Sequence, residues 1–326
     1  MATIYDVAKL AGVSPATVSR VYSGVVPVSA GKAEAVRRAA AELRFTPSGT
    51  ARALRTQSSE VIALVIPDIE NPYFTEMARG VEDVANDAGY SVVLCNTDGD
   101  RAKEAAYLDV AVSARMAGVI IAAADAGTDL GALHEHGRPV VAVDRTLEAA
   151  MDAVVMDNRE AGAAATEALL DAGYGRIACV TGPETVETAR QRAEGWRAAL
   201  ERRGLAAPSA RLRYSTFRVE GGRSAVDELL AASDPPDAIV AGNNLLGVGV
   251  LQRLAEHGLT PPALGVAVIG SLPYATLPVD AVTVVRLPAR DMGETGAQML
   301  LDRLHGDGRP PRTLTLHGVV RPAQPR

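Results

Sequence analysis

From residue 61 onward, short apolar runs alternate with stretches whose apolar residues recur at helical spacing. The apolar runs are continuous, which is typical of strands buried on both faces of a parallel sheet. Amphipathic stretches between them predict helices such as 73–88, 159–172 and 190–203. The expected strands are 61–67, 91–96, 118–124, 139–144, 176–182, 212–216, 238–243, 266–270 and 281–287. The pattern therefore predicts an α/β body built on parallel sheets.

Two such units, about 60–158 and 159–286, fit this body, and the final segment is expected to cross back between them. Ligands of open parallel sheets bind beyond the carboxyl ends of the strands, which here places the site between two lobes. Aromatic residues at such positions can stack on a sugar or a base, and polar ones can form directional hydrogen bonds. The candidates after strand ends and in nearby loops are Asn71, Tyr73, Phe74, Asp144, Arg145, Thr188, Arg192, Phe217 and Asn243. Alternatively, these residues line the cleft or join the lobes without contacting a ligand.

The first 58 residues predict helices instead of strands. Thr3 can cap a helix that ends near Gly12, and Gly12 supplies the backbone freedom for a tight turn. Ser14 can cap the next helix, and Pro15 suits its first position. A third helix is expected at 30–43, with Val36, Ala40 and Leu43 as its apolar stripe. The order of helix, short turn and helix is that of a helix-turn-helix, although many small helical hairpins without a DNA partner share it.

The residues in this segment are more specific than its geometry. The string IYDVAKLAGVSPATVSRVYSG (4–24) resembles the N-terminal motif of the lactose-repressor (LacI/GalR) family of bacterial transcription regulators. TPSGTARALR (46–55) is similar to the hinge of that family, and the likeness extends over the remaining chain. The resemblance implies an all-α helix-turn-helix domain at 1–46 and a hinge helix and linker at 47–58. It implies a two-lobed domain for effector binding and dimerisation at 59–326, similar to periplasmic sugar-binding proteins.

The second helix of a helix-turn-helix lies in the major groove, and residues near its start meet base edges. Pro15, Ala16 and Arg20 occupy those positions, and Arg20 can bond guanine in a bidentate manner. The hydroxyl groups of Ser14, Thr17 and Ser19 suit phosphate oxygens. The alternatives are a phosphate contact for Arg20 and a solvated helix face for Thr17 and Ser19.

The expected hinge helix is too short to be stable alone in water, so it should fold only when its apolar side is covered. The resemblance implies that two hinge helices meet in the minor groove and that Leu54 of each inserts between base pairs. Arg52 and Arg55 flank Leu54 and can neutralise phosphates or enter the narrowed groove. The alternative for Leu54 is a linker residue packed on the body.

The charge distribution supports the division of the chain into an N-terminal DNA-binding part and a larger body. The chain of 326 residues has a net charge of −6, which by itself argues against a nucleic-acid partner. Residues 1–58, however, hold eight basic and three acidic side chains, a net charge of +5, and the remainder carries −11. A basic head can neutralise phosphates while an acidic body is repelled by the same duplex.

Two departures from the family pattern concern the effector. The family commonly has Gly, an aromatic residue and Asp after the strand VAVIG, whereas this chain has Gly270, Ser271 and Leu272. Leu287 stands where the family usually has Gln. Because two polar anchors at effector-contacting positions have become apolar, the ligand is expected to be less polar, smaller or phosphorylated than usual, or to be absent. The ligand class stays open among a sugar, a sugar derivative and a nucleobase-like molecule.

No catalytic motif was found. The chain lacks a phosphate-binding GxxxxGK[ST] loop and a GxSxG elbow, and its two cysteines lack metal-ligand spacing. We therefore expect no enzyme activity, no cofactor and no metal. Without a long apolar run or a secretory signal pattern, a membrane-free, cytoplasmic protein is expected.

The sequence thus predicts a homodimeric transcription regulator, most often a repressor in the resembling family, which binds double-stranded operator DNA through paired heads. A small-molecule effector in the interlobe cleft would control it. The alternative is a solute-binding protein without DNA-binding activity.

Overall fold

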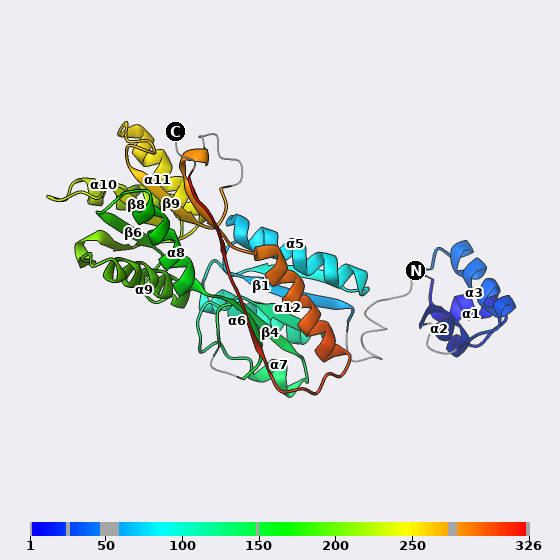
Figure 1. The fold of residues 1–326 in the computed structure, drawn as a ribbon. Helices are drawn as coiled ribbons and strands as arrows, with labels where there is room; N and C mark the ends of the chain where they lie inside the picture. Colours follow the sequence, from blue (N-terminus) through cyan, green and yellow to red (C-terminus); the bar gives the residue numbers. More distant parts are fainter. Residues whose placement is uncertain (1, 24–26, 46–58, 148–149, 273–278, 324–326) are drawn as a thin grey trace. The chain divides into compact units, whose positions relative to one another are not determined.

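The computed structural model describes residues 2–23, 27–45, 59–147, 150–272 and 279–323 (Figure 1). The chain divides into two compact units, Met1–Glu60 and Val61–Arg326. None of the helices that the structure describes combines the length and the apolar character needed to cross a membrane.

The first unit contains the helices α1 (Ile4–Leu10), α2 (Pro15–Ser23) and α3 (Ala30–Glu42). One apolar residue from each helix, Val7, Val18 and Val36, is fully buried in the shared core. The buried stripe of α3 differs from the predicted one, because Ala39 is buried beside Ala40 while Leu43 is only partly covered.

Local hydrogen bonds explain where the first two helices begin. Thr3 and Asp6 form a reciprocal capping box, in which Thr3 Oγ1 accepts the Asp6 N–H and the Asp6 carboxylate accepts the Thr3 N–H at 2.8 Å. Gly12 has φ +64°, a conformation that side chains disfavour, and it turns the chain after α1. Ser14 Oγ then accepts the Thr17 N–H at 3.2 Å and caps α2. These predicted caps and the predicted turn are confirmed.

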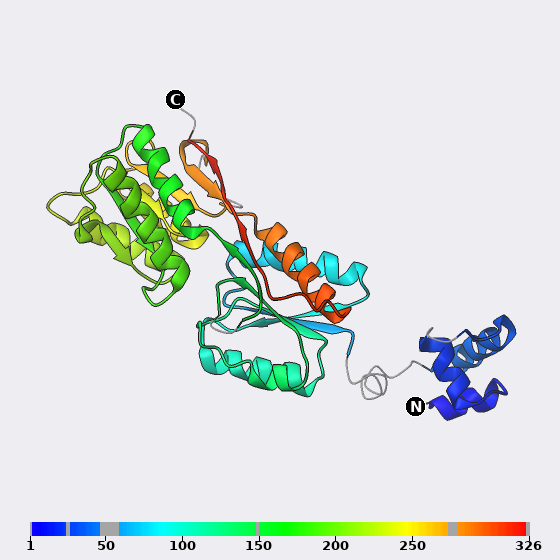
Figure 2. The same ribbon diagram turned by 60° about the horizontal axis from the view of Figure 1, so that its bottom comes forward.

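The second unit has two lobes, each built on a six-stranded sheet (Figures 1 and 2). The first sheet is parallel throughout and has the order β11-β5-β4-β3-β1-β2. Helices α5 and α12 pack on one of its faces, and α6 and α7 on the other. The bounds in the first lobe are β1 (Val61–Ile66), α5 (Pro72–Asp87), β2 (Ser91–Asn96), α6 (Arg101–Ser113), β3 (Gly118–Ile121), α7 (Gly131–Glu135), β4 (Val140–Asp144), β5 (Asp152–Met156), α12 (Ala289–Leu304) and β11 (Thr313–Leu316).

The second sheet has the order β12-β10-β9-β8-β6-β7. Its other strands are parallel, as predicted, and the edge strand β12, which the sequence pattern did not reveal, pairs antiparallel with β10. Helices α8 and α9 cover one face, and α10 and α11 the other. The bounds are α8 (Asn158–Asp171), β6 (Ile177–Thr181), α9 (Glu187–Arg202), η1 (Ser209–Arg211), β7 (Leu212–Tyr214), α10 (Val219–Leu230), β8 (Ala238–Ala241), α11 (Asn244–Glu256), β9 (Gly265–Ile269), η2 (Val279–Ala281), β10 (Thr283–Arg286) and β12 (Val319–Arg321).

Within the described elements, the chain passes between the lobes three times: from β5 to α8, from β10 to α12, and from β11 to β12. The predicted return of the final segment is therefore confirmed, and the structure adds that α12 and β11 complete the first lobe. Figure 1 shows the last connection, in dark red, running from the first lobe to the second.

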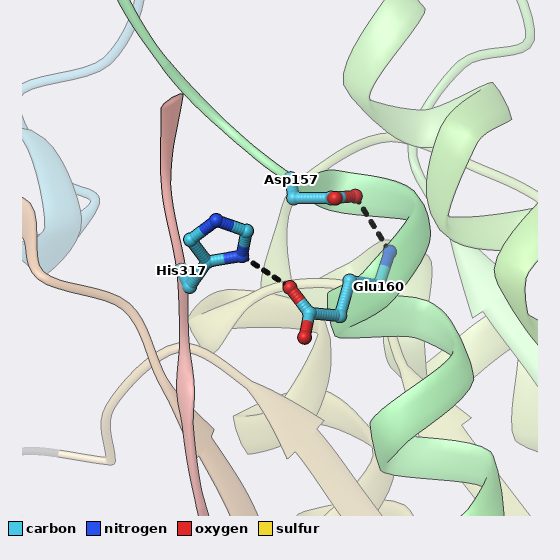
Figure 3. Close-up of side chains that lie close together, drawn as sticks. All are labelled: Asp157, Glu160 and His317. Atoms are coloured by element: carbon cyan, nitrogen blue, oxygen red, sulfur yellow. Dashed lines mark hydrogen bonds and ion pairs between the residues drawn. The ribbon is translucent and has the colours of Figure 1, made fainter. Parts of the chain in front are cut away.

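Side chains tie the first and last of these connections together (Figure 3). Asp157, directly before α8, accepts the backbone N–H of Glu160 at 2.8 Å and caps the helix. Nδ1 of His317, which lies between β11 and β12, contacts the Glu160 carboxylate in an ion pair. The connection between β11 and β12 is thus joined by an ion pair to α8, the helix that follows the connection from β5.

Candidate functional site

The exposed face of α2 carries the side chains predicted to meet DNA. Ser14, Ala16 and Arg20 are exposed, Pro15, Thr17 and Ser19 are partly covered, and only Val18 among them is buried in the helical core. Ser14 Oγ and Thr17 Oγ1 lie 3.0 Å apart at the start of this helix. The exposed face of α3 adds the basic side chains Lys32, Arg37 and Arg38. The predicted hinge residues Arg52, Leu54 and Arg55 lie outside the described residues.

In the second unit, a cavity of about 380 Å³ lies between the lobes, at the carboxyl ends of the strands. Nine predicted pocket residues line it: Asn71, Tyr73, Phe74, Asp144, Arg145, Thr188, Arg192, Phe217 and Asn243. Sequence reasoning missed Pro67, Asp68, Asp98, Gly99, Ala124, Pro183, Thr185, Val186, Thr216, Arg218, Asn244 and Ile269. Asp68, Asn244 and Arg218 are each adjacent to a predicted strand end or pocket residue, so extending the search by one or two positions would have found them.

A buried charged group forms the floor of the cavity. Arg192 on α9 and Asp144 at the end of β4 are each 5% exposed, and they come from different lobes. Burial lowers the pKa of Arg192, whereas the negative charge of Asp144 opposes that shift. Burial also raises the pKa of Tyr73 well above its usual value, and Asp144 raises it further. Tyr73 is therefore a neutral hydroxyl group, which donates to Met292 Sδ at 3.2 Å and lies near an arginine that stays charged.

Asp144 and Arg145 form a tight turn where β4 ends. Asp144 has φ +67°, and the Arg145 N–H donates to the carbonyl oxygen of Val143 at 2.7 Å. A positive φ at a residue other than glycine costs about 1–3 kcal/mol of conformational free energy and is found preferentially at functional sites. The turn lets Arg145 Nη1 donate to the Ala123 carbonyl at 2.7 Å. Arg145 Nε is buried without a hydrogen-bond acceptor, and it lies 3.4 Å from Asp144 Oδ2. This buried donor is thus compensated by the charge of Asp144 and not by a hydrogen bond.

The two pocket asparagines also have structural roles. Asn71 Oδ1 accepts the Tyr73 N–H at 3.1 Å and caps α5, and Asn243 Oδ1 accepts the Leu246 N–H at 2.8 Å and caps α11. Asn243 Nδ2 additionally donates to the Phe217 carbonyl at 3.4 Å. Capping fixes the amide planes, so the pocket face of each asparagine is held in position.

Aromatic rings flank the charged floor. Tyr73 and Phe74 meet edge to face with ring centroids 5.1 Å apart in the first lobe. Phe217 approaches from the second lobe and packs over Gly182, where a Cβ atom would lie 2.2 Å from the ring. The Phe217 ring occupies the space that a side chain at position 182 would fill.

The two leucines that depart from the family pattern have different positions. Leu287 is 5% exposed and lines the cavity, so its apolar character bears on the ligand. Leu272 was predicted to contact the effector, but it is not among the lining residues and packs against the apolar core of the second lobe. An isobutyl side chain gains more from that apolar surface than from a polar cleft, which accounts for its placement outside the cavity lining.

Charged residues from both lobes meet at the mouth of the cavity. Arg218, directly before α10 in the second lobe, donates from Nη1 to Asp68 Oδ1 at 3.1 Å and to Glu70 Oε2 at 2.5 Å. Its Nη2 lies 3.9 Å from Asp98 Oδ1. The lining as a whole contains three aspartates (Asp68, Asp98, Asp144) and three arginines (Arg145, Arg192, Arg218), and is therefore balanced in charge.

Comparison with known proteins decides the family. Residues 59–317 match the family described as periplasmic binding proteins and sugar binding domain of LacI family. Residues 3–48 match the bacterial regulatory proteins of the lacI family. The chain belongs to the LacI family. This LacI-family chain is 34% identical over 316 residues to the ribose operon repressor of Escherichia coli K12, covering 93% of both chains.

Other LacI-family members support the assignment. The transcriptional repressor PurR of Photobacterium profundum is 30% identical over 311 residues, covering 93% of this chain and 92% of that protein. A transcriptional regulator CelR–cellobiose complex is 27% identical with a TM-score of 0.75, covering 99% of this chain and 100% of that one. The lac repressor dimer bound to operator and the anti-inducer ONPF shares the fold, with 23% identity, a TM-score of 0.84 and coverage of 99% and 98%.

These findings establish the class of function. The LacI-family chain is a DNA-binding transcription repressor with an effector-binding domain, and its relatives are repressors, not enzymes. The predicted family, fold class and function are thereby confirmed. The roles assigned to individual residues remain predictions.

Proposed function

We propose that this LacI-family repressor binds a two-fold symmetric operator as a homodimer and that a neutral small molecule in the interlobe cavity controls that binding. Residues 1–46 are the DNA-reading domain, 47–58 the hinge and linker, and 59–326 the domain for effector binding and dimerisation. The protein acts on bacterial chromosomal DNA and hence in the cytoplasm.

The exposed face of α2 supports the DNA-reading part of the proposal. Arg20 and Ala16 are exposed there, while Val18 is buried in the core. Arg20 reads guanine, and the hydroxyl groups of Ser14, Thr17 and Ser19 bind phosphates. One short recognition helix offers few base contacts, so two heads on two half-sites are required for a specific site.

The cavity carries the effector part of the proposal. Its buried Asp144 and Arg192 offer an acceptor and a donor, and its aromatic walls come from both lobes. This combination suits a small polyhydroxylated or planar molecule, such as a sugar, a sugar derivative or a nucleobase. Because three arginines balance three aspartates, we favour a neutral ligand. A sugar phosphate would add uncompensated negative charge.

The surface of the first lobe supports dimerisation. Strand β2 is at the edge of its sheet, and Val93 on this strand is 41% exposed. Ile69, just after β1, is 47% exposed. A second copy of the chain would cover such apolar side chains.

A gel-shift titration against the promoter region beside the protein's own gene tests the proposal, with a shuffled duplex as competitor. We expect a specific complex with the mass of a dimer. A thermal-shift screen across sugars, sugar phosphates and nucleobases should identify a ligand that raises the melting temperature and changes operator affinity. Ligand binding without any sequence-specific retention of DNA would favour a solute-binding protein instead.

A further inference from the structure

We propose that Arg218 is an interlobe latch: it holds the effector-binding domain closed through Asp68 and Glu70 and thereby sets how readily the cavity opens. The proposal deepens the proposed function, since it concerns regulation of the same cavity. Its test requires neither DNA nor effector.

The latch crosses the cleft between parts of the chain that are distant in sequence. Arg218 is the residue directly before α10 in the second lobe, whereas Asp68 and Glu70 follow β1 in the first lobe. The Arg218 contacts with them span 150 and 148 positions in sequence. A guanidinium has a fork of donors, so one side chain can bond two carboxylates at once.

Two of its carboxylate partners, Asp68 and Asp98, are positioned by hydrogen bonds within the first lobe. Asp68 is only 9% exposed, and its Oδ1 also accepts the Glu70 N–H at 3.0 Å. Asp98 has φ +56°, and its carboxylate is bonded by Lys103 Nζ at 2.6 Å and Asn96 Nδ2 at 2.8 Å. Because these carboxylates are fixed on the first lobe, Arg218 contributes the interaction that depends on lobe closure.

The exposure of the group suits a reversible contact. The Arg218 side chain is 39% exposed and Glu70 75% exposed, so both can return to water when the lobes part. Asp68 is the buried partner, and opening restores its hydration. Exposed ion pairs contribute little energy and are weakened by salt, so this contact can form and break as the lobes move.

Among the described residues, Thr146 and Ser271 also form hydrogen bonds across the cleft. Thr146 donates to Glu187 at 3.0 Å, and Ser271 donates to Glu76 at 3.4 Å. Each is a single hydrogen bond from a neutral hydroxyl group, so each should respond less to salt than the contacts of Arg218. Their presence means that loss of Arg218 should shift the lobes toward opening without separating them entirely.

Lobe closure can be measured by single-molecule fluorescence energy transfer in the full chain without ligand. Dyes are attached through Asp87→Cys at the end of α5 and Glu201→Cys on α9, two exposed positions in different lobes. The natural Cys95 and Cys179 are buried and should not react. Labelled chains are mixed with excess unlabelled chains, so that a dimer carries at most one labelled copy.

We expect Arg218→Ala to raise the ratio of open to closed molecules at least about threefold. Arg218→Lys should be intermediate, because an ammonium lacks the guanidinium fork. Raising NaCl to about 1 M, where the Debye length falls to roughly 3 Å, should open the wild type and change Arg218→Ala little. The double variant Asp68→Asn, Glu70→Gln should open the lobes nearly as much as Arg218→Ala, since it neutralises the two carboxylates that Arg218 bonds and leaves only Asp98, 3.9 Å away.

Arg223→Ala is the matched control. Arg223 lies on α10, the helix that Arg218 directly precedes, and forms an arginine–carboxylate ion pair with Glu256, 2.9 Å away, but both residues are in the second lobe. It should leave the distribution unchanged. A wild-type distribution for folded Arg218→Ala, or equal opening in Arg223→Ala, would overturn the latch and leave the proposed function untouched. Conversely, absence of operator binding would remove the proposed function and leave the measured latch standing.

Discussion

Arg192 donates a hydrogen bond from Nε to Asn158 Oδ1, 2.9 Å away, and so connects the floor of the cavity to the first passage between the lobes. Asn158 in turn donates from Nδ2 to the carbonyl oxygen of Met156, the last residue of β5, at 3.3 Å. The guanidinium also donates from Nη1 to the carbonyl of Gly242. A ligand that moves the Arg192 side chain therefore acts, through Asn158, on the junction of β5 and α8.

Replacing Asn158 with Ala should weaken both ligand binding and its effect on DNA. A buried guanidinium donor would lose its acceptor, at a cost of about 1–3 kcal/mol, or roughly tenfold in ligand affinity. Calorimetry with the ligand found in the screen measures the affinity, and gel shifts with and without ligand measure the coupling. Asn86→Ala, at an exposed position near the end of α5, is the control. Unchanged coupling in Asn158→Ala would mean that the signal takes another route.

Gly182→Ala should disturb the ligand wall, because the new methyl group would lie 2.2 Å from the Phe217 ring. The ring must move, and overpacking of this kind typically costs about 1–3 kcal/mol of stability. We expect ligand affinity to fall at least about tenfold. Gly175→Ala, where the added Cβ would meet nothing within 4 Å, should bind as the wild type does. Equal affinity in both variants would show that Phe217 does not contact the ligand.

Arg20→Ala should relax base preference at one position of each half-site, with a loss of about 1–3 kcal/mol on the preferred sequence. Selection from a randomised operator library gives the preference, and competition gels give the energies. Lys32→Ala, on the exposed face of α3, is a useful comparison. A uniform loss across all sequences after Arg20→Ala would identify that residue as a phosphate contact.

Leu54→Ala tests the hinge, which lies outside the described residues. If Leu54 unstacks a base step, its loss should weaken specific operator binding far more than binding to random DNA. Titrations of both duplexes at one fixed salt concentration measure the ratio. Leu10→Ala, at a 46% exposed position on α1, should leave that ratio unchanged. Equal losses on both duplexes after Leu54→Ala would show that it is not a wedge.

Asp152→Asn should destabilise the first lobe. Asp152 is 4% exposed and accepts from Arg303 Nε at 2.7 Å and from the Arg312 N–H at 2.9 Å. Burial acts to raise its pKa, but the bonds from Arg303 and Arg312 outweigh burial and lower the pKa overall. We expect a loss of about 3 kcal/mol in the free energy of unfolding at neutral pH.

The lowered pKa also fixes the sign of the pH effect. A carboxylate with a lowered folded-state pKa stabilises the protein above its unfolded pKa, and this stability is lost as the pH falls through the folded value. Urea titrations between neutral and acidic pH should therefore show a smaller acid loss in Asp152→Asn than in the wild type. Parallel pH profiles would contradict this account.

Most of the strands could be predicted because they are continuous apolar runs, and their predicted ends differ from the observed ones by only a few residues. Strand β5 was missed because it is short and begins with Asp152, a residue that is buried only because Arg303 neutralises it. Strands β11 and β12 were missed for another reason. Thr313–Leu316 is mostly exposed and Val319 is 70% exposed, so neither strand has the buried apolar pattern.

The sequence predicted those pocket residues that lie at or shortly after the end of a predicted strand. Asp144 and Asn243 could be found because parallel sheets place such residues at one edge. The partners of Arg218 could not, since no local pattern shows which loop of one lobe faces which loop of the other. The position of Leu272 outside the cavity lining could not be predicted from the family pattern, because its apolar side chain packs against the core of the second lobe instead.

The last connection has a consequence for how the protein is made. Strand β11 adds to the first lobe beside β5, and β12 then adds to the second lobe beside β10. A nascent chain that has emerged from the ribosome as far as β10 therefore contains most of both sheets and completes neither. The two lobes therefore reach their final form almost together, once the segment that carries both strands is free to pair. A stop codon shortly before residue 313 would thus damage both lobes at once.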